Sequence, residues 1–75
     1  MKQAVEKHKQ AIHYAHRSLD AYLRNEMSEA GRFMFQAINL DMEILNNKEG
    51  LDEELIKVIE MYHENMSYIY RTLLS

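Results

Sequence analysis

The chain has 75 residues and a formal net charge of −3, and it contains no cysteine and no proline. A chain of this length forms one domain, residues 1–75, and buries only about 60% of the surface that it exposes when unfolded. Domains of this size therefore depend on disulfides, a metal or a partner chain, and the lack of cysteine excludes disulfides. The basic residues form no continuous stripe that could follow a phosphate backbone, so we do not expect nucleic acid as a partner.

The first predicted helix carries apolar residues at the a and d positions of a heptad pattern. This seam consists of Val5, His8, Ile12, Ala15, Leu19 and Tyr22, and is flanked by Ala4 and Ala11. Because small residues are frequent in it, we expect this helix to pack closely and to contribute modestly to the core. Asn25 can end the helix in a left-handed conformation and Ser28 can cap the next one, which predicts a turn over residues 25–28.

The second predicted helix, residues 28–47, is apolar around more than half of its circumference. At about 100° per residue it presents three apolar stripes: Phe33, Ala37, Leu40 and Ile44; Met34, Ile38 and Leu45; and Phe35 with Met42. One neighbouring helix cannot cover three stripes, so this helix should lie centrally, contact another chain, or do both. We expect the stripe of Phe33 in the core, and Phe35 and Met42 against another chain. Gly31 is expected to let another helix approach closely.

Asp41 lies inside the apolar arc of the second helix. A lone carboxylate there loses free energy on burial unless it is paired or protonated. Candidate partners are His16, Arg17, Tyr22, Tyr62, Tyr70 and His63. We expect a structural hydrogen bond that fixes the register of the helices; a metal ligand and a contact for a partner are the alternatives.

A third helix is predicted after the turn-like segment that ends at Gly50. Asp52 is a suitable N-cap, and Leu51 can pack on Ile56 as a hydrophobic staple, so the helix should begin near Asp52. Its apolar band consists of Leu55, Ile59, Tyr62, Met66, Ile69 and Leu73, widened by Val58, Tyr70 and Leu74. Three helices joined by short turns predict an all-α fold, an antiparallel three-helix bundle with up-down-up topology.

Two pairs of residues suggest metal chemistry, but neither forms a complete site. Glu60 and His63 have the Glu-x-x-His spacing with which di-iron bundles present ligands, and His13 and His16 have the same spacing. A site of that class needs two such pairs and further glutamates, so we expect no metal and no cofactor, and a metal-binding bundle is a distant alternative. The few hydroxyl side chains have no associated base or glycine-rich elbow, so we expect no enzymatic activity.

The order of small, apolar and tyrosine positions carries a family resemblance from about Gln10 onward. The pattern consists of Ala11-Ile12, Ala15, Leu19, Glu29-Ala30, Ala37-Ile38, Leu45, Leu55, Tyr62, Met66, Tyr68 and Arg71-Thr72-Leu73. It resembles the flagellin-specific export chaperones of bacteria. The members of that family are helical bundles that bind the unfolded C-terminal segment of flagellin along apolar grooves and deliver it for export.

The resemblance implies which residues line such a groove in this chain: Ile38, Met42, Leu45, Ile56 and Tyr62. Family chains begin with an additional N-terminal segment that this sequence lacks. The resemblance therefore implies either a permanently open groove or a relative with another role.

We expect a protein-binding helical bundle, an export chaperone or adaptor that holds an amphipathic or disordered segment of a partner such as flagellin. With Phe35 included, the expected partner-binding residues are Phe35, Ile38, Met42, Leu45, Ile56 and Tyr62. The alternative is a self-associating, homodimeric structural or regulatory protein. No apolar run is long enough to cross a membrane, and the first ten residues lack the apolar core of a signal peptide, so we expect a cytoplasmic location without membrane contact.

Overall fold

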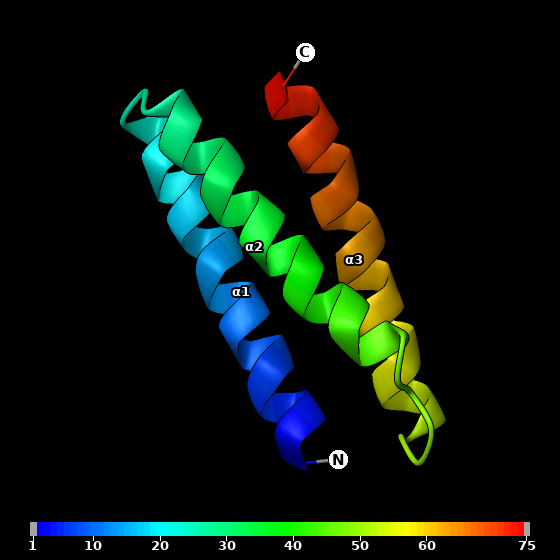
Figure 1. Ribbon diagram of the computed structural model, residues 1–75. Coiled ribbons are helices and arrows are strands. Elements are labelled where there is room, and N and C mark those ends of the chain that lie inside the picture. Colours follow the sequence, from blue (N-terminus) through cyan, green and yellow to red (C-terminus); the bar gives the residue numbers. More distant parts are fainter. Residues whose placement is uncertain (1, 75) are drawn as a thin grey trace.

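The computed structural model describes residues 2–74, which form three α-helices and no strand: α1 (Lys2–Leu23), α2 (Met27–Leu45) and α3 (Glu53–Leu74). The prediction of an all-helical chain with three helices is therefore confirmed. Figure 1 shows α2 between α1 and α3, with the amino-terminal ends of α1 and α3 at the same end of the molecule. The molecule is elongated, with extents of 40 × 20 × 15 Å.

The turn between α1 and α2 is built on Asn25, which has a positive φ of 64°. The N–H of Glu26 donates to the carbonyl of Ala21, at 2.8 Å, and the N–H of Asn25 donates to the carbonyl of Tyr22, at 2.9 Å. These two bonds form a Schellman motif, which satisfies the last carbonyls of α1 and confirms the predicted role of Asn25. The predicted cap at Ser28 is wrong: Glu26 is the N-cap residue, and its side chain makes no capping bond to the backbone of α2, because the motif leads the chain directly into this helix.

The connection to α3 follows the predicted signals closely. Gly50 has a φ of 80°, a left-handed conformation that glycine adopts without strain. The side chain of Asp52 accepts a hydrogen bond from the N–H of Glu54 at 3.3 Å, and α3 begins at Glu53. The predicted start of the third helix near Asp52 is confirmed, whereas α2 ends two residues earlier than predicted, at Leu45.

Small side chains hold α1 against α2, and this is the larger of the two main helix interfaces. The fully buried small residues are Ala11, Ser18 and Ala21 on α1, and Ala30 and Ala37 on α2. The hydroxyl of Ser18 donates to the backbone carbonyl of Ala30 across this interface. A row of alanine and serine side chains lets two helix backbones approach closely. Helix α1 therefore packs on α2 through its small residues, and large residues of its a and d seam stay outside this interface.

The core extends along α2, which explains why that helix is apolar on several sides. Its buried members are Ala11, Met34, Ala37, Ile38 and Met66, with Tyr14, Ala15, Leu40, Ile69, Tyr70 and Leu73 packed around them. Phe33 was expected in this core but is only half-buried, because it lies at the α1 edge under the guanidinium group of Arg17, 4.6 Å from its ring centre. Gly31 is buried, and a Cβ placed on it would lie 3.9 Å from Leu74, an ordinary van der Waals distance.

The side of the bundle between α1 and α3 stays open. Both helices pack on α2, but they contact each other only weakly. The rings of His8 and Tyr62, whose centres are 4.9 Å apart, bring α1 and α3 together near their amino-terminal halves. The three helices therefore do not close around one core on all sides. Among residues 2–74, none of the three helices combines the length and apolar character needed to cross a lipid bilayer.

Candidate functional site

A hollow of 490 Å³ lies between the carboxyl-terminal halves of α1 and α3, above the start of α2. We call it the apolar groove; it is lined by Leu19, Tyr22, Met27, Tyr68, Ile69, Thr72 and Leu73. None of these residues carries a charge. Leu19, Tyr22 and Met27 are 44%, 46% and 45% exposed, and Tyr68 is 64% exposed. The groove is therefore an apolar surface open to solvent.

The groove exists because α1 carries two neighbouring stripes of different size. Its small residues face α2, so the larger seam residues Leu19 and Tyr22 turn towards α3. On the opposite wall, Ile69 and Leu73 are half-buried and pack against the buried residues of the core. Large side chains on both walls meet no third helix between them, and their outer surfaces stay exposed.

The apolar surface continues beyond the groove along the same side of the molecule. Leu23 lies one turn after Leu19, Val58 lies one turn before Tyr62, and Met61 lies two turns before Tyr68, so helical periodicity places each on the same face as its neighbour. We call this surface the open face. Among residues 2–74, it contains eight of the eleven exposed large apolar residues: Leu19, Tyr22, Leu23, Met27, Val58, Met61, Tyr62 and Tyr68.

A smaller apolar stripe lies on α2 and consists of Phe35 and Met42. These residues are two turns apart and are 48% and 41% exposed. The ring of Phe35 lies 5.7 Å from that of Tyr70, centre to centre, so α3 already covers part of it. We call this pair the α2 stripe.

The six residues that the sequence indicated for partner binding do not lie on one surface. Phe35 and Met42 form the α2 stripe, whereas Tyr62, 38% exposed, lies against His8 on the open face. Ile38 is 8% exposed and belongs to the core, so it offers a partner almost no surface. Leu45 and Ile56 are half-buried.

Asp41 is fully buried and forms a hydrogen bond with His8, with 2.8 Å between Oδ1 and Nδ1. The expected hydrogen bond of this carboxylate is confirmed, but its partner, His8, was not among the expected candidates. Of those candidates, His63 lies near enough to interact with the carboxylate electrostatically. His8 was placed in the apolar seam of the first helix; the structure buries it to 7% exposure beside Asp41. An ionised Asp41 accepts the bond, so His8 then donates from Nδ1.

Burial raises the pKa of Asp41 above its ordinary value of 3.8, because the charged carboxylate has lost its water. The hydrogen bond with His8 and the nearby imidazoles of His8 and His63 oppose this shift without cancelling it. Three buried polar atoms of this cluster have no hydrogen-bond partner among the described residues: Asp41 Oδ2, His8 Nε2 and His63 Nδ1. The hydrogen bond between His8 and Asp41 therefore joins α1 to α2, next to α3, and its polar groups lose their contact with water when they are buried.

In the part of the chain that the structure describes, the acidic and histidine side chains do not assemble into a metal centre. Within residues 2–74, no group of three or more such side chains is placed to hold a metal ion. Glu60, one half of the Glu-x-x-His pair, lies 3.9 Å from the amine of Lys48 and is exposed to solvent. The pair that suggested metal chemistry in the sequence thus has its carboxylate on the surface.

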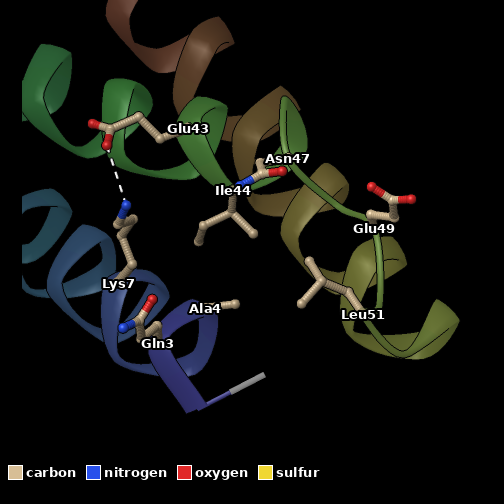
Figure 2. Close-up of a pocket in the computed structure, with 8 residues that line it drawn as sticks. All are labelled: Gln3, Ala4, Lys7, Glu43, Ile44, Asn47, Glu49 and Leu51. Atoms are coloured by element: carbon tan, nitrogen blue, oxygen red, sulfur yellow. Dashed lines mark hydrogen bonds and ion pairs between the residues drawn. The ribbon is translucent and has the colours of Figure 1, made fainter.

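A second hollow, of 240 Å³, lies between the start of α1 and the loop that leads to α3 (Figure 2). An ion pair crosses its upper edge, with 3.2 Å between the amine of Lys7 and a carboxylate oxygen of Glu43. The remaining lining residues are Gln3, Ala4, Ile44, Asn47, Glu49 and Leu51. Exposed ion pairs contribute little to stability, and Lys7 and Glu43 are engaged with each other, so this hollow offers no evident binding chemistry.

No protein-family model, curated protein or solved structure matches this chain. The resemblance to flagellin-specific export chaperones therefore stays a prediction from the sequence. The two tyrosines of the pattern that carries this resemblance, Tyr62 and Tyr68, lie on the open face.

Sequence reasoning located the surplus apolar surface on α2 and, at Met61 and Tyr68, on α3, and assigned the contact with another chain to α2. Most of the exposed large apolar residues between 2 and 74 lie on α1 and α3. One signal in the sequence pointed to this arrangement. Ala4, Ala11 and Ser18 recur every seven residues beside the larger seam of α1. Two adjacent stripes on one helix indicate that only one of them can face the nearest neighbour.

Proposed function

We propose that the chain is an antiparallel, up-down-up three-helix module that binds another polypeptide on its open face. The apolar groove between α1 and α3 carries this proposal. Contiguous exposed apolar surfaces on small domains commonly mark interaction sites, whereas apolar residues exposed singly need no explanation. The module acts by binding, without a catalytic step or a cofactor.

The shape and chemistry of the groove favour an amphipathic helix as its occupant. Two helices form the walls and a third forms the floor, so a fourth helix laid along the groove would complete a four-helix arrangement. Met27 can adapt to an irregular partner, and Tyr22 and Tyr68 combine apolar rings with hydroxyls that can reach solvent. We propose the cytoplasmic role of an export chaperone or adaptor, with the C-terminal segment of flagellin as the partner that the resemblance implies.

Fluorescence anisotropy with two labelled peptides tests this function. One is a synthetic amphipathic helix of leucine and lysine, and the other has the same composition in a scrambled order. We expect the wild-type protein to bind the amphipathic peptide and not the scrambled one. A peptide from the flagellin C-terminus, measured in parallel, tests the particular partner.

Leu19→Glu is the informative variant, because Leu19 lines the groove and is exposed enough for the fold to tolerate a charge. We expect it to weaken peptide binding at least about tenfold, since a tenfold loss corresponds to about 1.4 kcal/mol and burying a leucine side chain contributes about 1.5–3 kcal/mol. Met42→Glu is the matched control, with similar exposure but a position on the α2 stripe. Equal binding of both peptides, or a loss caused by Met42→Glu and not by Leu19→Glu, would overturn the proposal.

A further inference from the structure

We infer that a second copy of this chain covers the open face when no partner segment is bound, forming a two-fold symmetric homodimer. This inference rests on the proposed function only in taking the open face as a binding surface. It adds an occupant and a form of regulation, because a partner helix must then displace the second copy. Surface area, symmetry and the distribution of charge each favour this occupant.

The chain exposes more surface than a folded monomer of its mass normally does. Its accessible surface is 5355 Å² for a mass of 9.0 kDa. The usual scaling of surface with mass gives about 4,850 Å² for such a protein, so the excess is about 500 Å². If each of two copies hides that excess, about 1,000 Å² is buried in total, the size at which specific interfaces begin.

The arrangement of the helices suits a two-fold axis that is parallel to them. The amino-terminal ends of α1 and α3 lie at the same end of the molecule (Figure 1). Rotation about such an axis, with the two open faces together, lays α1 of one copy over α3 of its partner at the same level. Each copy then provides one α1 and one α3 to the interface, as an isologous contact requires.

In this arrangement, a row of exposed residues on α1 lies opposite a row of exposed residues on α3. We call these rows the outer lines, and they are complementary in charge. Residues seven apart lie almost above one another on a helix. The line on α1 consists of Lys2, Lys9, His16 and Leu23, and the line on α3 consists of Glu54, Met61 and Tyr68. Each line begins with a charged residue and ends with an apolar or aromatic one, and the charges at the amino-terminal ends have opposite signs.

The parallel axis therefore places Lys2 of one copy near Glu54 of its partner, and the carboxyl-terminal ends of the two lines against each other. A two-fold axis perpendicular to the helices would instead lay α1 over the partner's α1 in the opposite direction. Lys2 would then face the partner's Leu23, and the pair of opposite charges between Lys2 and Glu54 would not form. The sequence of the two lines thus selects α1 against α3 as the pairing.

Light scattering on the full chain across a micromolar concentration series tests the dimer. We expect the wild-type mass to rise from that of one 9.0 kDa chain towards twice that value. Tyr68→Glu should weaken dimerisation at least tenfold, because Tyr68 is 64% exposed on the open face. Met42→Glu, on the α2 stripe, should leave it unchanged. A wild-type protein that stays monomeric, or a dimer that Met42→Glu dissociates while Tyr68→Glu does not, would overturn the inference.

A charge exchange tests the predicted pairing of the helices. Lys2→Glu and Glu54→Lys should each weaken the dimer, and the double variant should restore it, because the opposite charges are then exchanged between the two lines. Both residues are exposed, so circular dichroism should show unchanged helical content. A purely local effect of either substitution on folding would not be reversed by the other, so failure of the double variant to recover would refute the pairing of α1 with α3.

Adding the amphipathic peptide to the dimer separates this inference from the proposed function. We expect the peptide to lower the mass of the assembly to that of one chain with peptide bound. A monomer that binds peptide through the groove would overturn the dimer and leave the function standing. A dimer that the peptide neither binds nor dissociates would overturn the function and leave the dimer standing.

Discussion

Replacing Asp41 by alanine tests whether the buried bond to His8 stabilises the fold. Asp41 is 0% exposed, and its Oδ1 lies 2.8 Å from His8 Nδ1. The substitution removes the acceptor and leaves a nitrogen of His8 buried without a partner. The side chain lies where α1, α2 and α3 come together, since the ring of Tyr62 packs against His8 at 4.9 Å.

The expected magnitude follows from two opposing effects. Leaving a buried donor unsatisfied costs about 1–3 kcal/mol. Removing the carboxylate also relieves the desolvation that raises its pKa, which keeps the loss below the larger values seen when a buried ion pair is broken. We expect Asp41→Ala to lower the free energy of unfolding by about 1–3 kcal/mol, and each kcal/mol corresponds to about 4–8 °C in Tm for a domain of this size.

Urea denaturation followed by circular dichroism measures this loss, with all variants at one protein concentration because self-association would change the apparent stability. Asp41→Asn should cost less than Asp41→Ala, since an amide oxygen can still accept a hydrogen bond from His8. The His8→Ala variant and the double variant complete a cycle, which should give a coupling of about 0.5–3 kcal/mol. An Asp41→Ala protein as stable as the wild type would refute a stabilising role for the bond.

Three further predictions follow from buried or strained positions. Because the pKa of Asp41 is raised above 3.8 in the folded state, ionisation of this carboxyl group destabilises the fold. The free energy of unfolding of the wild type in urea, relative to that of Asp41→Asn, should therefore fall as the pH rises from 3.8 through the raised pKa. A difference between the two proteins that does not change with pH would contradict this. Gly31→Ala should raise the Tm and stabilise the fold by up to about 1 kcal/mol, since the added Cβ meets only Leu74 at 3.9 Å. Gly50→Ala should lower the free energy of unfolding by about 1–2 kcal/mol, because Gly50 has a φ of 80°. The reverse order of stability would contradict both expectations. Ser18→Leu should destabilise by about 1–3 kcal/mol in thermal melting, because it overpacks the close α1–α2 interface, and an unchanged Tm would show that the interface has room.

The number of helices and their ends could be read from the sequence because they depend on local backbone chemistry. Asn25 adopts the left-handed conformation that ends α1, and Asp52 caps α3 through its side chain. The three apolar stripes of α2 predicted that this helix lies centrally, contacts another chain, or does both, and the core around Met34 and Ile38 shows the central position. The cap at Ser28 was wrong because two local signals competed within four residues and the Schellman motif prevailed.

The sequence by itself thus determined the helices, their turns, the central place of α2 and the existence of more apolar surface than one small core can use. Only the tertiary structure decided where that surplus lies and which residue meets Asp41. Both depend on the same choice, the face that α1 turns towards α2. The small residues around Ala11 and Ser18 allow the closest approach, so they face α2, His8 reaches Asp41, and Leu19 is left exposed beside the groove. Periodicity shows that a helix has an apolar face, but when two faces adjoin, the packing of whole helices selects between them.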